Sequence, residues 1–232
     1  MDIFYSELIQ DSHIALPSDE SKHCVKVLRH KAGDTIHVID GKGNLYLCCI
    51  TEISQKHTIA EILETHTDYG SHPFTVRMAV APTKNMQRYE FFVEKAVELG
   101  VNEIIPILCD HSERKVVKTE RIERIVLAAM KQSYKAQKPI VHEMTPFTNI
   151  VSAEYSGYKA IAHCENDDKH SLMHIEKKQK ITILIGPEGD FSSKEIQLAR
   201  ENNWVPITLG PQRFRTETAA IMALHSVHCV FR

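Results

Sequence analysis

Hydrophobic and polar residues follow two different patterns along the chain. In the N-terminal part, short apolar runs at 34–40, 44–53 and 57–64 are separated by short polar or glycine-containing turns. Runs of this length between turn residues are typical of β-strands. Several short strands close together predict a small antiparallel β-barrel, which we assign to residues 1–70.

Beyond Pro73, strand-like and helix-like segments alternate. Five apolar runs predict strands, at 75–81, 103–108, 158–164, 181–186 and 205–210. Helical periodicity of apolar residues predicts helices at 86–99, at 119–137, from about 193, and at 217–230. This alternation is typical of a parallel sheet covered by helices. The predicted fold class of residues 73–232 is therefore α/β.

Composition narrows the class of protein. Hydrophobic residues make up 43% and charged residues 25% of the chain, the balance of an ordinary globular protein. No apolar run approaches the roughly 20 residues of a membrane span, and the acidic N-terminus does not resemble a signal peptide. We therefore expect a cytoplasmic protein with no membrane partner.

The six cysteines and fourteen histidines do not form a recognisable metal-binding motif. No two cysteines have CxxC spacing, and the histidines and cysteines within 163–174 and 225–229 lack the paired spacing of zinc sites. In the cytoplasm we expect the cysteines to be reduced and to act as small buried hydrophobic residues. We predict no metal site.

Charge is distributed unevenly, although the net charge is only −2. Residues 1–70 contain six Lys and Arg against eleven Asp and Glu, whereas residues 71–232 contain 22 against 19. Within the second part, segment 113–138 holds eight basic against three acidic residues. Such an excess suits a phosphate backbone, but it also suits the solvated face of a helix, and the sequence leaves both interpretations open.

Two predicted loops have residues suited to ligand binding, because ligands of open parallel sheets lie at the carboxyl ends of the strands. The loop 186–190 reads Gly-Pro-Glu-Gly-Asp, where glycine lets a backbone approach a ligand closely and proline stiffens the turn. The loop that begins at Leu209 contains Arg213, Arg215 and Glu217 before the last helix. Each loop alone also fits an ordinary turn between a strand and a helix.

Taken together, in this order and spacing, the two loops resemble those of the SPOUT class of methyltransferases. The C-terminal chain of that class forms a trefoil knot that holds S-adenosylmethionine, a threading that sequence patterns alone do not predict because knots are rare. Within the class, the chain resembles the RsmE family, which methylates N3 of a uridine in 16S ribosomal RNA. The resemblance implies a PUA-like barrel that binds RNA over residues 1–70 and a knotted methyltransferase domain over 73–232.

Further motifs carry the same resemblance over most of the chain. They are the His-x-x-x-Val-Leu-Arg segment at 23–29, Lys84 with the helix segment 94–100, and Gln132-Ser133 followed by Pro139. Two positions depart from the family pattern. Asp190 stands where many relatives have a second glycine, and Lys135 stands where arginine is frequent, which keeps the charge but loses the bidentate geometry of a guanidinium.

The resemblance implies a cofactor site built largely from backbone groups of the two loops. The matching positions in this chain are Leu184, Ile185, Gly186, Pro187, Gly189, Leu209, Gly210, Phe214, Arg215, Thr216, Thr218 and Ala219. A loop at 163–165 is a weaker match that would complete the pocket. The implied cofactor is S-adenosylmethionine, with no metal.

Methylation of uracil N3 requires removal of its proton, which calls for a base and for a cation that stabilises the anion. Glu217 is the only carboxylate inside the second loop, so we expect it to be the base or the group that orients the base. Arg215 is the candidate cation, for the anion or for a neighbouring phosphate.

Two sets of basic residues are candidates for RNA contacts. Lys22, Lys26 and Arg29 have helical spacing and could form one basic edge, with Val25 and Leu28 pointing inward, although an ordinary amphipathic helix has the same pattern. The other candidates, of which those within 114–124 are the strongest, are Lys84, Arg114, Lys115, Lys118, Arg121, Arg124 and Lys135.

The partners implied are 16S rRNA or the small ribosomal subunit and, by resemblance alone, a second copy of the chain. Two alternatives remain open. The chain could be a knotted RNA-binding protein without catalytic activity, which the intact loops disfavour, or a SPOUT enzyme that methylates a 2′-hydroxyl of tRNA ribose, which the N-terminal barrel disfavours.

Overall fold

The computed structural model describes residues 2–174 and 180–231 and divides the chain into two compact units. Unit 1 contains Met1–Ser71 and Leu127–Lys138, and unit 2 contains His72–Val126 and Pro139–Arg232. The helix α3 (Thr119–Ser133) runs across the division. A segment from the middle of the chain therefore belongs to the N-terminal unit, which no local pattern in the sequence indicated.

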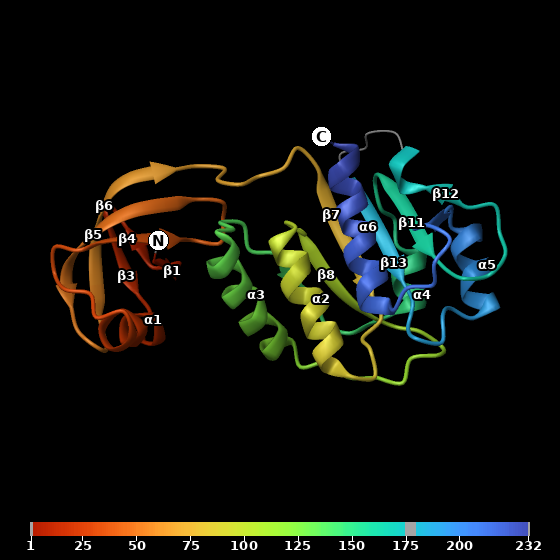
Figure 1. The fold of residues 1–232 in the computed structure, drawn as a ribbon, viewed down its shortest axis with the longest axis horizontal. Coiled ribbons are helices and arrows are strands. Elements are labelled where there is room, and N and C mark those ends of the chain that lie inside the picture. The colour runs from red at the N-terminus through yellow and green to blue at the C-terminus, as the bar shows by residue number, and fades with distance from the viewer. Residues whose placement is uncertain (1, 175–179, 232) are drawn as a thin grey trace. The chain divides into compact units, whose positions relative to one another are not determined.

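Unit 1 is built on one curled six-stranded sheet with the order β1-β4-β5-β6-β3-β2 (Figure 1). Its elements are β1 (Ile3–Tyr5), β2 (Ile9–Gln10), β3 (His13–Leu16), α1 (Ser18–Lys22), the π-helix η1 (His23–Val27), β4 (Thr35–Ile39), β5 (Leu45–Ile53) and β6 (Thr58–His66). All neighbouring strands are antiparallel except β1 and β4. The inner face buries Phe4, Ile14, Val38 and Ile50, which accounts for the alternating pattern.

The basic segment of unit 1 is not the regular helix that its spacing suggested. The α-helical turn α1 passes directly into η1, and Arg29 then adopts a left-handed backbone conformation with φ 59°. A π-helix has a wider turn than an α-helix, so the i, i+4, i+7 spacing does not hold one face. Leu28 is 36% exposed and Val27 is 63% exposed, so the prediction that Leu28 points inward is wrong.

Unit 2 contains an eight-stranded sheet in which every observed strand pair is parallel. The order is β10-β8-β7-β13-β11-β14-β12, with β9 also pairing with β8. The strands are β7 (Thr75–Val80), β8 (Glu103–Leu108), β9 (Ile140–Val141), β10 (Thr145–Pro146), β11 (Tyr158–Ala162), β12 (His170–Ser171), β13 (Lys180–Ile185) and β14 (Val205–Thr208). The predicted α/β class and the small N-terminal β unit are confirmed.

Helices cover the sheet of unit 2 as the alternation predicted (Figure 1). They are α2 (Met86–Glu98), α4 (Phe147–Ser152), α5 (Ser193–Glu201), α6 (Thr216–Val230) and the short 3-10 helix η2 (Leu172–His174). α2 and α6 pack side by side, and α6 also contacts β7 and β13. α4 and α5 contact one another and belong to a different cluster of the core.

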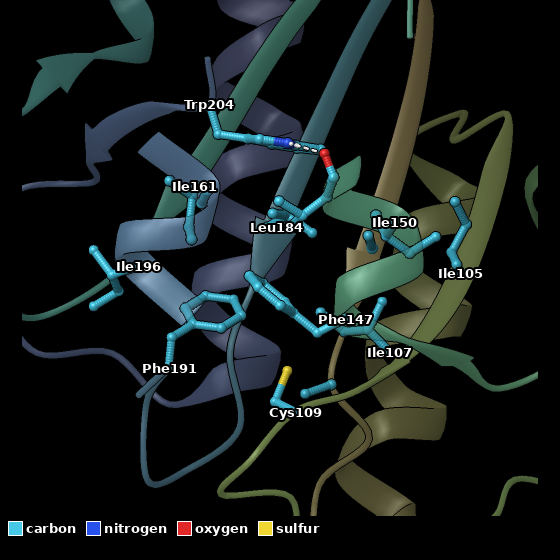
Figure 2. Packing of buried hydrophobic residues seen from close by; sticks show 14 residues of the cluster. Ile105, Ile107, Cys109, Phe147, Ile150, Ile161, Leu184, Phe191, Ile196 and Trp204 are labelled. Atoms are coloured by element: carbon cyan, nitrogen blue, oxygen red, sulfur yellow. Dashed lines mark hydrogen bonds between the residues drawn. The ribbon is translucent and has the colours of Figure 1, made fainter. Parts of the chain in front are cut away.

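Figure 2 shows the core between the sheet and the helices α4 and α5. Ile161 and Leu184 project from the central strands towards Phe147 and Phe191, and Trp204 closes one end of the cluster. The Trp204 indole donates a hydrogen bond from Nε1 to the carbonyl oxygen of Val151 at 3.1 Å. Burial of these large side chains fixes the strands whose carboxyl ends form the site.

The long basic helix ends earlier than predicted. α3 stops at Ser133 instead of residue 137, because Tyr134 adopts a left-handed conformation with φ 56° and the chain turns there. The apolar face predicted from Ile122 to Met130 is confirmed, since Ile122, Val126 and Met130 are fully buried. No helix among the described residues is long and apolar enough to cross a bilayer.

The cysteines do not pair, and half of them are buried as predicted. Burial raises the pKa of the Cys24 thiol to about 11, with nearby carboxylates adding to the effect, and burial raises the pKa of Cys48 to about 12. Cys164, in contrast, is exposed. The expectation of a buried hydrophobic role therefore fails for this residue, which lies in a loop.

Candidate functional site

A cavity of about 650 Å³ lies in unit 2 at the carboxyl ends of β11, β13 and β14. This is the edge of the sheet where ligands of parallel α/β folds bind, and the volume lies within the range of small-molecule sites. Its lining residues come from three loops and the start of α6: Ala162, His163, Cys164, Lys169, Ile185, Gly186, Pro187, Glu188, Asp190, Ile207, Thr208, Leu209, Gly210, Pro211, Gln212, Arg213, Phe214, Arg215, Thr216 and Ala219.

The structure brings most of the predicted cofactor residues together around this cavity. Those that line it are Ile185, Gly186, Pro187, Leu209, Gly210, Phe214, Arg215, Thr216 and Ala219. Three do not: Leu184 is buried in the core behind the sheet, Gly189 faces the loop after β8, and Thr218 is exposed on α6. The lining also includes Lys169, Glu188 and Arg213, which the sequence analysis did not assign to the site.

The loop after β13 has a tightly constrained backbone. A Cβ atom on Gly186 would lie 3.1 Å from the ring of Phe191 and 3.3 Å from its backbone nitrogen, so a larger residue would displace the loop. Asp190 adopts a left-handed conformation with φ 63°. Glycine tolerates that conformation best, and aspartate is one of the few other residues that adopt it, so Asp190 can replace a glycine without a change of backbone path. The Asp190 carboxylate accepts a hydrogen bond at 2.7 Å from the backbone N–H of Cys164.

Loops that follow β7 and β8 hold the same segment from the other side. The Glu188 Oε1 atom accepts a hydrogen bond at 3.0 Å from the backbone N–H of Lys84, and the Arg114 guanidinium donates to the Lys84 carbonyl at 2.8 Å. His111 Nδ1 lies 3.0 Å and 3.1 Å from the carbonyl oxygens of Gly189 and Asp190. Both carbonyls can only accept, so Nδ1 carries the hydrogen. The loop is thereby fixed before any ligand binds.

The first turn of α6 forms another wall. Arg215 is the N-cap residue, and its exposed side chain lines the cavity. The Thr216 hydroxyl donates a hydrogen bond at 3.1 Å to the carbonyl oxygen of Gly186, which ties the helix to the loop after β13.

Glu217 points elsewhere, since it is 8% exposed and does not line the cavity. Its Oε1 atom lies 3.9 Å from Nε of Arg88 on α2, and its Oε2 atom is buried without a hydrogen-bond partner among the described residues. Arg215 and Glu217, which were predicted to act together, are therefore only two positions apart in sequence but lie in different places, Arg215 at the cavity and Glu217 at the contact between α2 and α6.

The loop after β11 supplies a buried histidine, His163, which the sequence indicated only as part of a weakly matching loop at 163–165. The His163 side chain is 0% exposed and its Nε2 atom lies 3.3 Å from the Asp167 carboxylate, which Arg200 contacts at 2.6 Å. Burial lowers the pKa of His163, and the nearby Lys169 lowers it further, so the imidazole is neutral at pH 7. The Lys169 ammonium donates to the His163 carbonyl at 2.7 Å at the edge of the cavity.

Many of the basic RNA candidates in unit 2 already have protein partners. Lys84 pairs with Glu113 at 2.7 Å and Arg121 with Glu90 at 2.6 Å. Arg114 and Arg124 donate to backbone carbonyls, whereas Lys115 and Lys118 are exposed with no ion pair among the described residues.

In unit 1 the candidates differ in their surroundings. Lys22 lies 3.5 Å from Asp19, and Lys26 and Arg29 are exposed. Lys135 is half-buried, and burial lowers the pKa of its ammonium group. No carboxylate pairs with it in the described part of the chain, so its charge remains available to a phosphate.

Within the described residues, no three His, Cys, Asp or Glu side chains are grouped so that they could hold a metal ion. The cavity instead combines apolar walls with both signs of charge. Ile185, Ile207 and Phe214 are apolar, Glu188 is acidic and Arg215 is basic. Such a lining suits a ligand with an aromatic part and charged ends.

Two protein families match the chain. Residues 70–228 match a family described as an RNA methyltransferase domain, and residues 16–63 match a family described as an RNA methyltransferase PUA domain. The first match alone covers more than half of the chain and all of the residues that line the cavity.

Individual relatives agree with these families. The ribosomal RNA small subunit methyltransferase E of Rickettsia conorii is 30% identical, with 97% of this chain and 95% of the relative covered, and that of Aquifex aeolicus is 29% identical, with 95% and 96% covered. Among solved structures, a "probable rRNA-methyltransferase" from Porphyromonas gingivalis has a TM-score of 0.91 at 34% identity, with 100% and 98% coverage. The methyltransferase E of Neisseria gonorrhoeae, bound to S-adenosylmethionine, has a TM-score of 0.88 at 28% identity, with 100% and 98% coverage.

Proposed function

Because this chain belongs to the RNA methyltransferase family of the ribosomal RNA small subunit methyltransferase E proteins, we propose that it methylates N3 of a uridine in 16S ribosomal RNA. It is an rRNA methyltransferase that uses S-adenosylmethionine. The observation that assigns this activity to one site is the cavity at the carboxyl ends of β11, β13 and β14. Its walls include the two loops that the sequence analysis identified as ligand-binding candidates.

The lining of the cavity fits the cofactor. S-adenosylmethionine has a purine and a ribose at one end and charged amino and carboxylate groups at the other. Apolar walls from Ile185, Ile207 and Phe214 suit the purine, and the charged groups of Lys169 and Asp190 stand at the rim for the amino-acid end. Backbone groups beside Gly186 and Gly210 line the cavity and suit the ribose.

When bound, the cofactor supplies an electrophilic methyl group, so the protein has to make the acceptor nitrogen nucleophilic. Arg215 is placed to stabilise the negative charge that develops on the uracil, because its side chain reaches the cavity without an ion-pair partner among the described residues. Glu217 takes a role in this proposal that differs from the two predicted for it, which were the base and the group that orients the base. It lies against Arg88 and anchors the first turn of α6, from which Arg215 projects.

Basic residues outside the cavity bind the RNA backbone. Lys115, Lys118, Lys26 and Arg29 are exposed, and Lys135 carries an unpaired charge within the described residues. The domain bounds 1–70 and 73–232 stay part of the proposal, with the curled sheet of unit 1 as an RNA-binding module. Because phosphate contacts release counterions, affinity for rRNA should fall steeply with salt, and a flat salt response would exclude these contacts.

The protein acts in the cytoplasm as a homodimer in this proposal. α2 and α6 pack side by side and carry exposed apolar side chains, with Phe91 48% and Met222 39% exposed. A second copy of the same surface would cover them, as isologous interfaces do. Sedimentation equilibrium should give twice the monomer mass, and Met222→Glu should shift it towards the monomer.

The decisive experiment is methylation of small subunits, or of free 16S rRNA, from a strain that lacks the modification. Purified protein and labelled S-adenosylmethionine should yield N3-methyluridine in nucleoside mass spectrometry. A 2′-O-methylated nucleoside would instead support the ribose methyltransferase, and donor binding without any methylated product would support an RNA-binding protein without activity.

A further inference from the structure

Deprotonation of uracil N3 needs a base that reaches the cavity. Among the described residues, Glu188 and Asp190 are the carboxylates that line it. Asp190 has other roles in this account, because its Oδ2 atom accepts the hydrogen bond from Cys164 that joins the loop after β11 to the loop after β13, and its charge is proposed to meet the amino group of the cofactor. Glu217 is buried beside Arg88 and does not line the cavity. Glu188 is therefore the carboxylate whose position and hydrogen bonding leave it available.

The environment of Glu188 orients the carboxylate without blocking it. Its Oε1 atom accepts the backbone N–H of Lys84 at 3.0 Å, which fixes the side chain from the outside of the cavity. Its Oε2 atom makes no hydrogen bond within the described residues, and the residue is exposed. One oxygen thus serves as the anchor, and the other can accept a proton.

The backbone beneath Glu188 is rigid enough to hold this geometry. Pro187 is buried, a Cβ atom on Gly186 would lie only 3.1 Å from the Phe191 ring, and the Thr216 hydroxyl donates a hydrogen bond to the Gly186 carbonyl. On the far side, His111 binds the carbonyl oxygens of Gly189 and Asp190. A base held on both flanks in this way loses little orientational freedom when the substrate binds.

Cationic side chains lie around the site and can stabilise the uracil anion. The Lys84 ammonium lies near Glu188, and the charge of Glu188 contributes to raising the pKa of that lysine after the larger effect of its hydrogen bond to Glu113. Arg213 and Arg215 line the same cavity. The site therefore holds one free carboxylate oxygen for a proton and cationic side chains for the anion that is left behind.

We propose that Glu188 is the catalytic base that accepts the N3 proton of the target uridine. The N3–H bond breaks, an O–H bond forms on the Glu188 carboxylate, and the electron pair stays on N3, where it forms the bond to the methyl group. The bond between the methyl carbon and the sulfonium sulfur breaks, its electron pair stays on the sulfur, and S-adenosylhomocysteine leaves as the neutral thioether. Solvent takes up the proton after the product leaves. This inference rests on the proposed function, since it concerns the acceptor that the proposal names.

The test compares Glu188→Gln with the matched charge change Glu154→Gln, which lies on an exposed loop away from the cavity. The amide introduced by Glu188→Gln keeps an oxygen for the Lys84 N–H but cannot take a proton. We expect kcat on uridine-containing 16S rRNA to fall by roughly 10²- to 10⁴-fold, whereas the dissociation constant for S-adenosylmethionine from calorimetry stays within about twofold of wild type. Glu154→Gln should match wild type in both.

A second readout separates a base from a residue that only holds the loop. RNA transcribed with 5-fluorouridine has a more acidic N3, so it depends less on a base, and raised pH supplies the uracil anion directly. The Glu188→Gln deficit should shrink on this RNA and at raised pH. Full turnover by Glu188→Gln, or an equal deficit on both RNAs at every pH, would overturn the assignment. Absence of N3 methylation by the wild-type protein would instead overturn the proposed function.

Discussion

The loop after β13 and the first turn of α6 face each other across the Thr216–Gly186 hydrogen bond, yet their carboxylates have opposite surroundings. Glu188 is exposed at the cavity and accepts a single backbone hydrogen bond. Glu217 is buried, faces Arg88 and leaves one oxygen unpaired among the described residues. Arg215 lies only two residues before Glu217, but its side chain lines the cavity, whereas that of Glu217 does not.

This difference shows that residue type and proximity in sequence do not assign a chemical role. A group that exchanges a proton has to reach the substrate, which Glu188 does and Glu217 does not. A buried carboxylate next to a guanidinium at a helix N-terminus is instead suited to holding two helices in place. The comparison therefore divides catalysis and positioning between the two regions. Changes at Arg215 and Glu217 test the division, and changes at His163 and Asp190 test the loops that surround the cavity.

The largest effect is expected at the cavity side of α6. Arg215→Ala should lower kcat at saturating cofactor by roughly 10²- to 10³-fold, because it removes the cation proposed to stabilise the developing negative charge. Arg215→Lys should recover part of the loss, since it keeps the charge without the planar guanidinium. Single-turnover methyl transfer measures both, and an Ala variant within threefold of wild type would contradict the role.

A smaller effect is expected two residues further along, at Glu217 in the first turn of α6. Glu217→Gln should lower turnover by about two- to tenfold through a shift of the first turn of α6, and Arg88→Ala should have a similar effect. The double variant should lose little more than either single one, because both changes disrupt one contact. A Glu217→Gln loss as large as that of Arg215→Ala would move the base to α6 and break the comparison.

The loop after β11 should make stability depend on pH. Burial and the neighbouring Lys169 lower the pKa of His163 in the folded protein. As the pH falls below the ordinary histidine pKa of about 6.5, the unfolded chain therefore binds a proton at this residue that the folded chain does not bind. The contribution of the neutral His163 to the free energy of unfolding is fully present above that pH and is lost as the pH falls below it.

Urea unfolding at pH 7.5 and 5.5 measures this effect, and His163→Gln should flatten the dependence. Asp167 contributes separately and only at lower pH. Burial acts to raise its pKa, but the hydrogen bond and charge of Arg200 outweigh that effect and lower it. Equal pH slopes for the variant and wild type would show that His163 is not the source.

The smallest effect is expected at Asp190. Asp190→Gly removes the hydrogen bond to Cys164 but also relieves the left-handed backbone, so the free energy of unfolding should change by less than about 1 kcal/mol. Asp190→Ala keeps the unfavourable φ and loses the same bond, and should destabilise by about 1–3 kcal/mol. Equal effects of the two substitutions would mean that the backbone conformation does not matter.

Local patterns predicted the framework of unit 2 well. The strand at 103–108 has the predicted bounds, and the helix α5 begins at the predicted residue 193. Both depend on residues that are neighbours in sequence, as the capping box of Ser192 and Glu195 shows for α5. The α3 helix was predicted too long, since the conformation of Tyr134 leaves no trace in hydrophobic periodicity. The wide turn η1 was missed for the same reason.

The site was predicted only in part, because its key contacts join distant segments. The sequence places Gly186, Gly210 and Arg215 in loops at strand ends, and the fold brings these loops together around one cavity. The bond from the Lys84 backbone to Glu188 spans 104 positions, and a backbone donor has no residue-specific signal. The inward or outward direction of Glu217 likewise depends on the packing of α2 against α6.

A crystal structure with bound S-adenosylmethionine tests the central claim most directly. The cofactor should occupy the cavity between the loop after β13 and the segment 209–215, in contact with the backbone of Gly186 and Gly210, with its methyl group towards Glu188 and Arg215. Density for the cofactor elsewhere, or a cavity filled by the protein's own side chains at saturating cofactor, would contradict the account.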